Sequence, residues 1–131
     1  MLIKNNNMTQ ENKQLLLKDL CARLPYGVKV LHDGNVKEVQ YVEPLYNEIK
    51  LLEDFSNYTV DICEVKPYLR PMSSMTEEES TTYEYSFLYS NDLRIYAEEY
   101  IDWLNAHHFD YRGLIERDLA LEAPEGMYKI D

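Results

Sequence analysis

The sequence lacks several features that would place a protein of this size in a familiar class. It has only two cysteines, Cys21 and Cys63, and neither belongs to a C-x-x-C pair, so neither a zinc knuckle nor a thioredoxin-type redox site is supported. No apolar run approaches the roughly 20 residues of a membrane-spanning helix. The N-terminal stretch MLIKNNNMTQENK has no apolar core of a signal peptide. We therefore expect a cytoplasmic protein that does not bind membranes. We also expect its two cysteines to be reduced rather than joined in a disulfide bond.

The common catalytic signatures are also missing. The chain contains no G-x-S-x-G, no Walker A, no G-x-G-x-x-G and no H-E-x-x-H motif. We expect no cofactor and no bound metal, and a non-enzymatic role is favoured over an enzyme.

Positive charge is scarce in one half of the chain. The net charge is −11, and residues 72–131 hold 14 Asp and Glu against 4 Lys and Arg. Such a field repels nucleic acid and anionic membranes and attracts basic partners. We expect no direct binding to nucleic acid, and a protein partner with a basic surface is one interpretation. The simpler interpretation is that the acidic charge only improves solubility.

With 131 residues, 45% of them hydrophobic, the chain is expected to form a single domain spanning 1–131. Its first element is predicted to be a helix that Thr9 caps and that ends before Pro25. The apolar stripe of this helix would hold Leu16, Leu17, Leu20, Cys21 and Leu24.

A β-hairpin is predicted next, and two registers compete. If Gly34 and Asn35 form the loop, Val30 faces Val39. If Asp33 and Gly34 form it, Val30 faces Lys37 instead. We prefer the first register, because it separates apolar from polar side chains better.

Two further strands are expected at 48–54 and 57–61, followed by one helical turn that Asp61 and Glu64 cap. Pro67 and Pro71 would then form an extended connector leading away from the sheet, with an internal hinge near 67–75. Thr76 and Glu79 form a capping box that opens a second helix, and a third runs from about Tyr96 to His107. The prediction is an α+β fold: an N-terminal helix, a small antiparallel sheet of three to four strands that could curl into a barrel, and acidic C-terminal helices.

Three stretches, LLLKDLCARLPYGVKV, VKPYLRPMSSMTEEE and DWLNAHHFDYRGLIERDLALEAPEGMY, resemble a group of small proteins from Bacteroides-type gut bacteria and their prophages and phages. The resemblance implies an intracellular setting linked to mobile elements. It supplies no catalytic residues, because the group has no established activity. This chain has Arg117 and Asp118 where the group has Lys-Gly, which weakens the expectation of a turn at 118.

The first functional hypothesis is an accessory protein of a mobile element or its host that acts by binding another protein. In one version it is an acidic decoy whose carboxylates occupy the DNA-binding groove of another protein. The third helix carries the expected contact residues, with Tyr83 and Tyr89 nearby. They are Tyr96, Glu98, Glu99, Tyr100, Asp102 and Trp103.

The second hypothesis is a small enzyme or metal protein centred on the stretch AHHFDYRG. Its residues would be His107, His108, Asp110, Tyr111 and Arg112. Adjacent histidines diverge by about 100° around a helix, so they do not form a metal pair, and we expect this stretch mainly to end the third helix. A third hypothesis is a structural role through self-assembly, and the sequence does not fix an oligomeric state.

Overall fold

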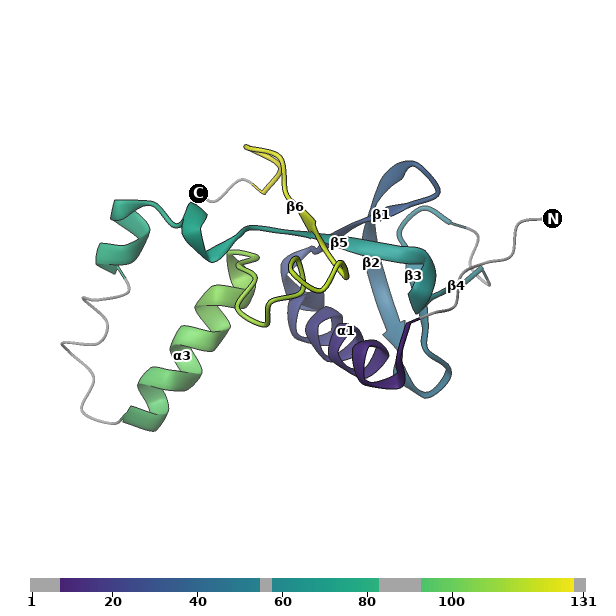
Figure 1. Cartoon of the computed structure of the whole chain (residues 1–131), viewed down its shortest axis with the longest axis horizontal. Coiled ribbons are helices and arrows are strands. Elements are labelled where there is room, and N and C mark those ends of the chain that lie inside the picture. The colour runs from purple at the N-terminus through teal and green to yellow at the C-terminus, as the bar shows by residue number, and fades with distance from the viewer. Residues whose placement is uncertain (1–7, 55–57, 83–92, 129–131) are drawn as a thin grey trace.

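The computed structural model describes residues 8–54, 58–82 and 93–128, without the side chains of 93–96. These residues form an α+β fold, as predicted, in which an N-terminal helix lies against a sheet and a second long helix projects away from it (Figure 1). The helices are α1 (Gln10–Arg23) and α3 (Leu93–Ala106), and short 3-10 turns are η1 (Leu24–Tyr26), η2 (Pro44–Tyr46), η3 (Ile62–Glu64) and η4 (Met72–Ser74). The strands are β1 (Lys29–His32), β2 (Asn35–Glu43), β3 (Glu48–Leu51), β4 (Val60–Asp61), β5 (Val65–Leu69) and β6 (Leu121–Glu122).

Helix α1 begins and ends where the sequence predicts. The Thr9 side chain accepts a hydrogen bond from the amide of Asn12, and the helix gives way to η1 and then to Gly27 at φ 69°. The buried face differs from the prediction, because Cys21 is exposed while Asp19 and Arg23 are fully buried. Cys21 therefore lies at the edge of the buried face, next to solvent.

The hairpin adopts the register that we did not prefer. His32 pairs with Asn35 and Val30 with Lys37, so the loop is Asp33-Gly34. Both loop residues have positive φ, 52° and 81°, as a type I′ turn requires. The preference of Asp33-Gly34 for a type I′ turn therefore outweighs the better pairing of apolar side chains in the other register. Placing Val30 opposite Lys37 costs little stability, because the ammonium of Lys37 reaches the Asp54 carboxylate at 2.6 Å.

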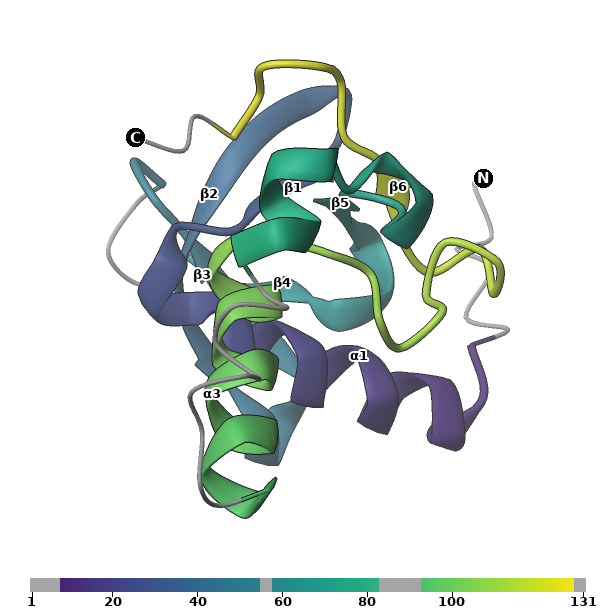
Figure 2. The same ribbon diagram turned by 90° about the vertical axis from the view of Figure 1, so that its left-hand side faces the viewer.

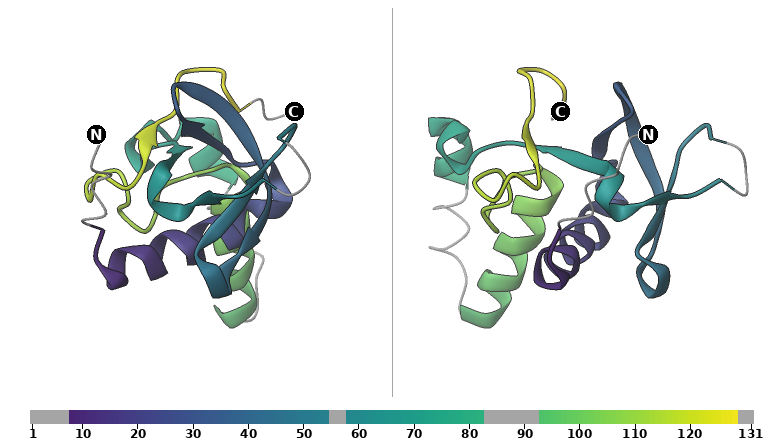
Figure 3. Two further views of the ribbon diagram at one scale, coloured as in Figure 1. Left: turned by 90° about the vertical axis from the view of Figure 1, so that its right-hand side faces the viewer. Right: turned by 45° about the vertical axis from the view of Figure 1, so that its right-hand side comes forward.

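The described strands form one mixed sheet in the order β4-β3-β2-β1-β5-β6 (Figure 3). The first four make an antiparallel meander, β5 returns antiparallel to β1, and β6 pairs with β5 in parallel. The prediction of three to four antiparallel strands is therefore wrong. Among these strands β4 and β6 lie at opposite ends of the order, so the sheet does not close into a barrel.

The predicted proline-rich connector is also wrong, because residues 65–69 form β5 inside the sheet. Val65, Pro67 and Leu69 are buried in alternation, which is the pattern of a strand. Pro67 pairs with Val30, and β6 joins β5 only from Tyr68 onward. A proline, which lacks an N–H, is tolerated at this point because the strand has not yet gained its second neighbour. The single domain spanning 1–131 and the hinge near 67–75 stay predictions.

The C-terminal half contains less helix than predicted. The capping box at Thr76 and Glu79 is confirmed by two reciprocal hydrogen bonds of 3.0 and 3.1 Å, and residues 77–82 are helical. After α3, however, residues 107–128 form turns and the short strand β6, so acidic helices throughout this half are not confirmed. The third helix ends near its predicted end, and Tyr83 and Tyr89 lie outside the described residues.

The core lies between α1 and the sheet, where Leu16, Leu20, Val28, Ile49 and Leu69 are all fully buried. Figure 2, which views the molecule from its α3 side, shows residues 77–82 and α3 on this side, with the loop after β6 above them. Among the described helices none is long and apolar enough to cross a membrane.

We expect Gly34→Ala to lower the free energy of unfolding by about 1 kcal/mol, because an L-residue is strained at positive φ. Nothing lies within 4 Å of a Cβ at this position, so only the backbone should respond. Asp33→Asn is the matched control and should be neutral or slightly stabilising, since Asn-Gly is the preferred type I′ pair. Urea denaturation measures both variants. A wild-type midpoint for Gly34→Ala would contradict the observed loop.

Candidate functional site

The predicted contact residues on α3 fall into two groups. Glu98, Glu99 and Asp102 are exposed, whereas Tyr100 and Trp103 are partly buried and lie with their ring centroids 6.5 Å apart. The side chain of Tyr96 is outside the described residues. On the same helix, Ile101 is 39% exposed and Asn105 is buried. The carboxylates therefore form the accessible part of the predicted surface.

The stretch AHHFDYRG ends α3, as predicted. The amide of Phe109 donates to the carbonyl of Leu104 and that of His108 to Asn105, which is the Schellman arrangement. His108 has φ 61°, at the position where glycine is usual. Phe109 and Leu104 are both buried behind this turn. The segment therefore has a structural role in closing the helix against the core.

The two histidines diverge and have different partners. His107 bonds the carbonyl of Trp103 through Nδ1 at 2.9 Å and stacks on the Trp103 ring. His108 is buried, donates from Nε2 to the carbonyl of Tyr26 at 3.0 Å and stacks on Tyr128 with ring centroids 3.7 Å apart. Within the part of the chain that the structure describes, no group of three or more His, Cys, Asp and Glu side chains is placed to hold a metal.

The other three residues of the second hypothesis also have partners. The Asp110 carboxylate accepts hydrogen bonds from the amides of Leu114 and Ile115, both at 2.9 Å, and so fixes the turn that follows. Tyr111 donates its hydroxyl proton to Asn105 Oδ1, and Arg112 donates to the Tyr111 oxygen. The structure therefore brings His107, His108 and Asp110 into three separate structural contacts rather than into one centre.

Sequence reasoning missed a fully buried charged pair, Asp19 and Arg23. The Arg23 guanidinium donates to both Asp19 carboxylate oxygens, at 2.8 and 3.1 Å, and to the carbonyl of Phe109 at 2.6 Å. Burial raises the pKa of the Asp19 carboxyl, and Arg23 opposes this shift. The available signal was an Asp and an Arg four residues apart on the leucine face of the helix. This pair fixes the end of α3 to α1.

A double-mutant cycle should show that this pair is strongly coupled. We expect Arg23→Met and Asp19→Leu each to lower the free energy of unfolding by about 3–5 kcal/mol, because each removes the hydrogen-bonded partner of a buried charge, and Arg112 lies only within 3.6 Å of Asp19. The double variant should lose clearly less than the sum of the two. Urea denaturation of all four proteins gives the coupling, and additive losses would show that the two charges act independently.

The burial of His108 gives the protein a specific dependence on pH. Burial, and next the nearby Arg23 charge, lower the pKa of His108 to about 4. The unfolded chain takes up this proton near the ordinary pKa of about 6.5, whereas the folded chain does not until about 4. Stability from this group is therefore complete above pH 6.5 and is lost as the pH falls toward 4.

We expect this single group to remove about 3 kcal/mol of stability between pH 6.5 and pH 4. His108→Asn keeps a residue that tolerates positive φ but does not titrate, so its stability should fall less over the same interval. The measurement is the free energy of unfolding of both proteins at each pH. Since all other groups are shared, equal losses would contradict the assignment.

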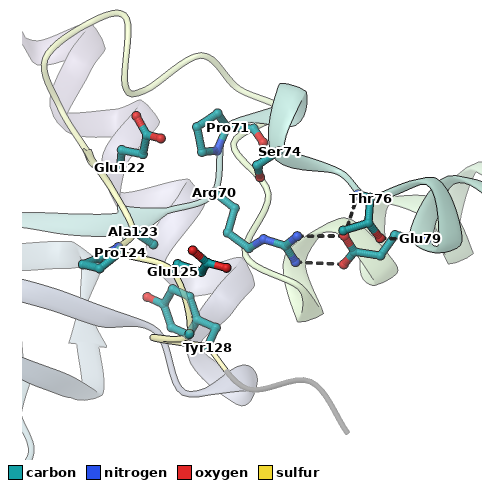
Figure 4. Close-up of a pocket in the computed structure, with 11 residues that line it drawn as sticks. Arg70, Pro71, Ser74, Thr76, Glu79, Glu122, Ala123, Pro124, Glu125 and Tyr128 are labelled. Atoms are coloured by element: carbon teal, nitrogen blue, oxygen red, sulfur yellow. Dashed lines mark hydrogen bonds and ion pairs between the residues drawn. The ribbon is translucent and has the colours of Figure 1, made fainter.

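A hollow with a volume of about 460 Å³ lies between the segment 70–79 and residues 122–128, at and after the end of β6 (Figure 4). On one side Arg70 makes a two-point ion pair with Glu79, at 2.9 and 2.7 Å, and its guanidinium lies 4.1 Å from the centre of the Phe109 ring. Hydrogen bonds from Arg70 lower the pKa of Glu79 to about 2. No sequence motif marked this hollow, because its two sides are about 50 residues apart in the chain.

Comparison with models of known protein families, with curated proteins and with solved structures gives no match. The resemblance to proteins of Bacteroides-type bacteria and their phages therefore stays a prediction.

Proposed function

We propose that this chain is a non-enzymatic accessory protein that binds another protein with a basic surface, and that α3 supplies the contact. The observation that carries the proposal is the exposure of Glu98, Glu99 and Asp102 on a helix that projects from the body of the protein (Figure 1). Such carboxylates are available to a partner without any rearrangement of the core. The partly buried Trp103 next to them supplies an aromatic ring of the kind enriched in protein interfaces.

The charge around α3 supports the same interpretation. Glu77 and Glu78 are exposed on the neighbouring helical residues 77–82, Glu122 is exposed at the end of β6, and Glu125 is exposed on the loop that follows. Residues 77–82 and α3 lie on the same side of the molecule (Figure 2), and residues 122–128 line a hollow together with the segment 70–79. A field of one sign concentrated at one end orients an oppositely charged partner before contact and accelerates its association.

The biological setting that we propose follows from the resemblance described above. The protein would act in the cytoplasm of a Bacteroides-type bacterium, as an accessory of a mobile element or of its host. A specific form of the proposal is an acidic decoy, in which the carboxylates take the place of phosphates in the DNA-binding groove of the partner.

The test is a tagged pull-down from a nuclease-treated lysate of such a bacterium, at about 50 mM and about 500 mM salt. We expect a specific protein to be captured at low salt and lost at high salt. The triple variant Glu98→Gln, Glu99→Gln, Asp102→Asn should weaken its capture about tenfold, because each exposed ion pair contributes on the order of 0.5 kcal/mol. In the decoy form, added duplex DNA should displace the captured protein.

The matched control removes three exposed carboxylates elsewhere, by Glu11→Gln, Glu53→Gln and Glu116→Gln. It should capture the partner as the wild type does. Equal loss in both triple variants would show that only net charge matters, and capture that does not respond to salt would contradict the proposal.

A further inference from the structure

The hollow between 70–79 and 122–128 differs from the acidic face of α3 because it is a shaped cavity with walls of distinct chemistry. Its apolar surface comes from Pro71, Ala123 and Pro124, together with the ring of Tyr128 (Figure 4). The carboxylates of Glu122 and Glu125 are exposed at its rim. Within the described part of the chain, neither of these two has an ion-pair or hydrogen-bond partner.

The cationic side of the hollow is already neutralised. Arg70 is the basic residue among those that line it, and both of its terminal nitrogens donate to Glu79. An anionic ligand would have to break this pair and would meet Glu122 and Glu125 as well. The charge balance of the hollow therefore favours a cation.

The wall that Tyr128 forms is held in place before any ligand arrives. The Tyr128 hydroxyl accepts a hydrogen bond from the amide of Lys29 at 2.9 Å and donates to the carbonyl of Tyr68 at 2.7 Å, and its ring stacks on His108. These contacts fix the loop after β6 on the sheet. A ligand therefore does not bear the entropic cost of ordering this wall.

We propose that this hollow receives the side chain of a lysine or an arginine. Either residue has an apolar stem that suits the Pro71, Ala123 and Pro124 surface, and a cationic head that Glu122 and Glu125 can bind at the rim. This inference rests on the proposed function, because it assigns one inserted side chain of the basic partner to a defined pocket.

The test uses small probes, so it does not require the partner. Nitrogen-15 NMR spectra of the full chain are recorded during titration with N-acetyl-arginine amide, N-acetyl-lysine amide and N-acetyl-citrulline amide. The citrulline compound has nearly the shape of the arginine compound but no charge. We expect the arginine or the lysine compound to shift the amide signals of Ser74, Glu122 and Gly126, with a dissociation constant on the order of 1 mM, and the citrulline compound to shift them far less.

Variants then locate the binding. Glu122→Gln and Glu125→Gln should each weaken binding about threefold, and the double variant about tenfold. Glu116→Gln, which removes an exposed carboxylate that does not line the hollow, should bind as the wild type does. Equal shifts with citrulline, shifts outside the hollow, or unchanged binding by the double variant would overturn the inference.

The two proposals fail in different ways. If the probes do not bind but the pull-down depends on α3 and salt, the hollow is not a cation pocket and the accessory role stands. If the probes bind at the hollow while no salt-sensitive partner is captured, the pocket stands as a site for a basic side chain and the role of α3 falls.

Discussion

The hydrogen bonds of the buried Arg23 guanidinium are the interaction on which the placement of α3 against α1 depends. It joins the Asp19 carboxylate in α1 to the carbonyl of Phe109 just after α3, so it connects the sheet-bound helix to the projecting one. A charge in an apolar interior is costly unless it is paired and hydrogen-bonded there, and Nε and Nη2 of Arg23 supply such bonds, whereas Nη1 has no partner among the described residues. These polar contacts, together with the buried Leu104, hold the C-terminal end of α3 to the body, while Glu98, Glu99 and Asp102 on the same helix are exposed.

The sequence predicts the local features of the fold well and the long-range ones poorly. The Thr9 cap, the capping box of Thr76 and Glu79 and the end of α3 each depend on residues within one helical turn, and all three are observed. Strand β5 was missed because two prolines obscured an alternating pattern, and its partner β6 comes some 50 residues later. The turn at Asp118, at φ 59°, forms without the glycine that the proposed resemblance suggested, since Asp tolerates this conformation.

The candidate site shows the same limit. Exposed carboxylates on α3 could be predicted from helical spacing, because charged residues outside an apolar stripe face solvent. The hollow beside β6 could not, since it exists only where two distant segments meet. The cluster of His107, His108 and Asp110 attracts attention in the sequence, yet its side chains fasten α3 and the following turn to the body. The exposed carboxylates of α3 are therefore carried by a helix whose C-terminal end is held in place by hydrogen bonds of His107, His108 and Asp110.

Tyr128 has a consequence for how the chain acquires its structure. Its hydroxyl bridges the amide of Lys29 and the carbonyl of Tyr68, and so occupies the place where β1 and β5 diverge, 99 residues away from Lys29 in the chain. Contacts between residues so distant in sequence form late and slow folding. During synthesis on the ribosome, the Lys29 amide and the Tyr68 carbonyl would therefore lack this partner until Tyr128 has emerged.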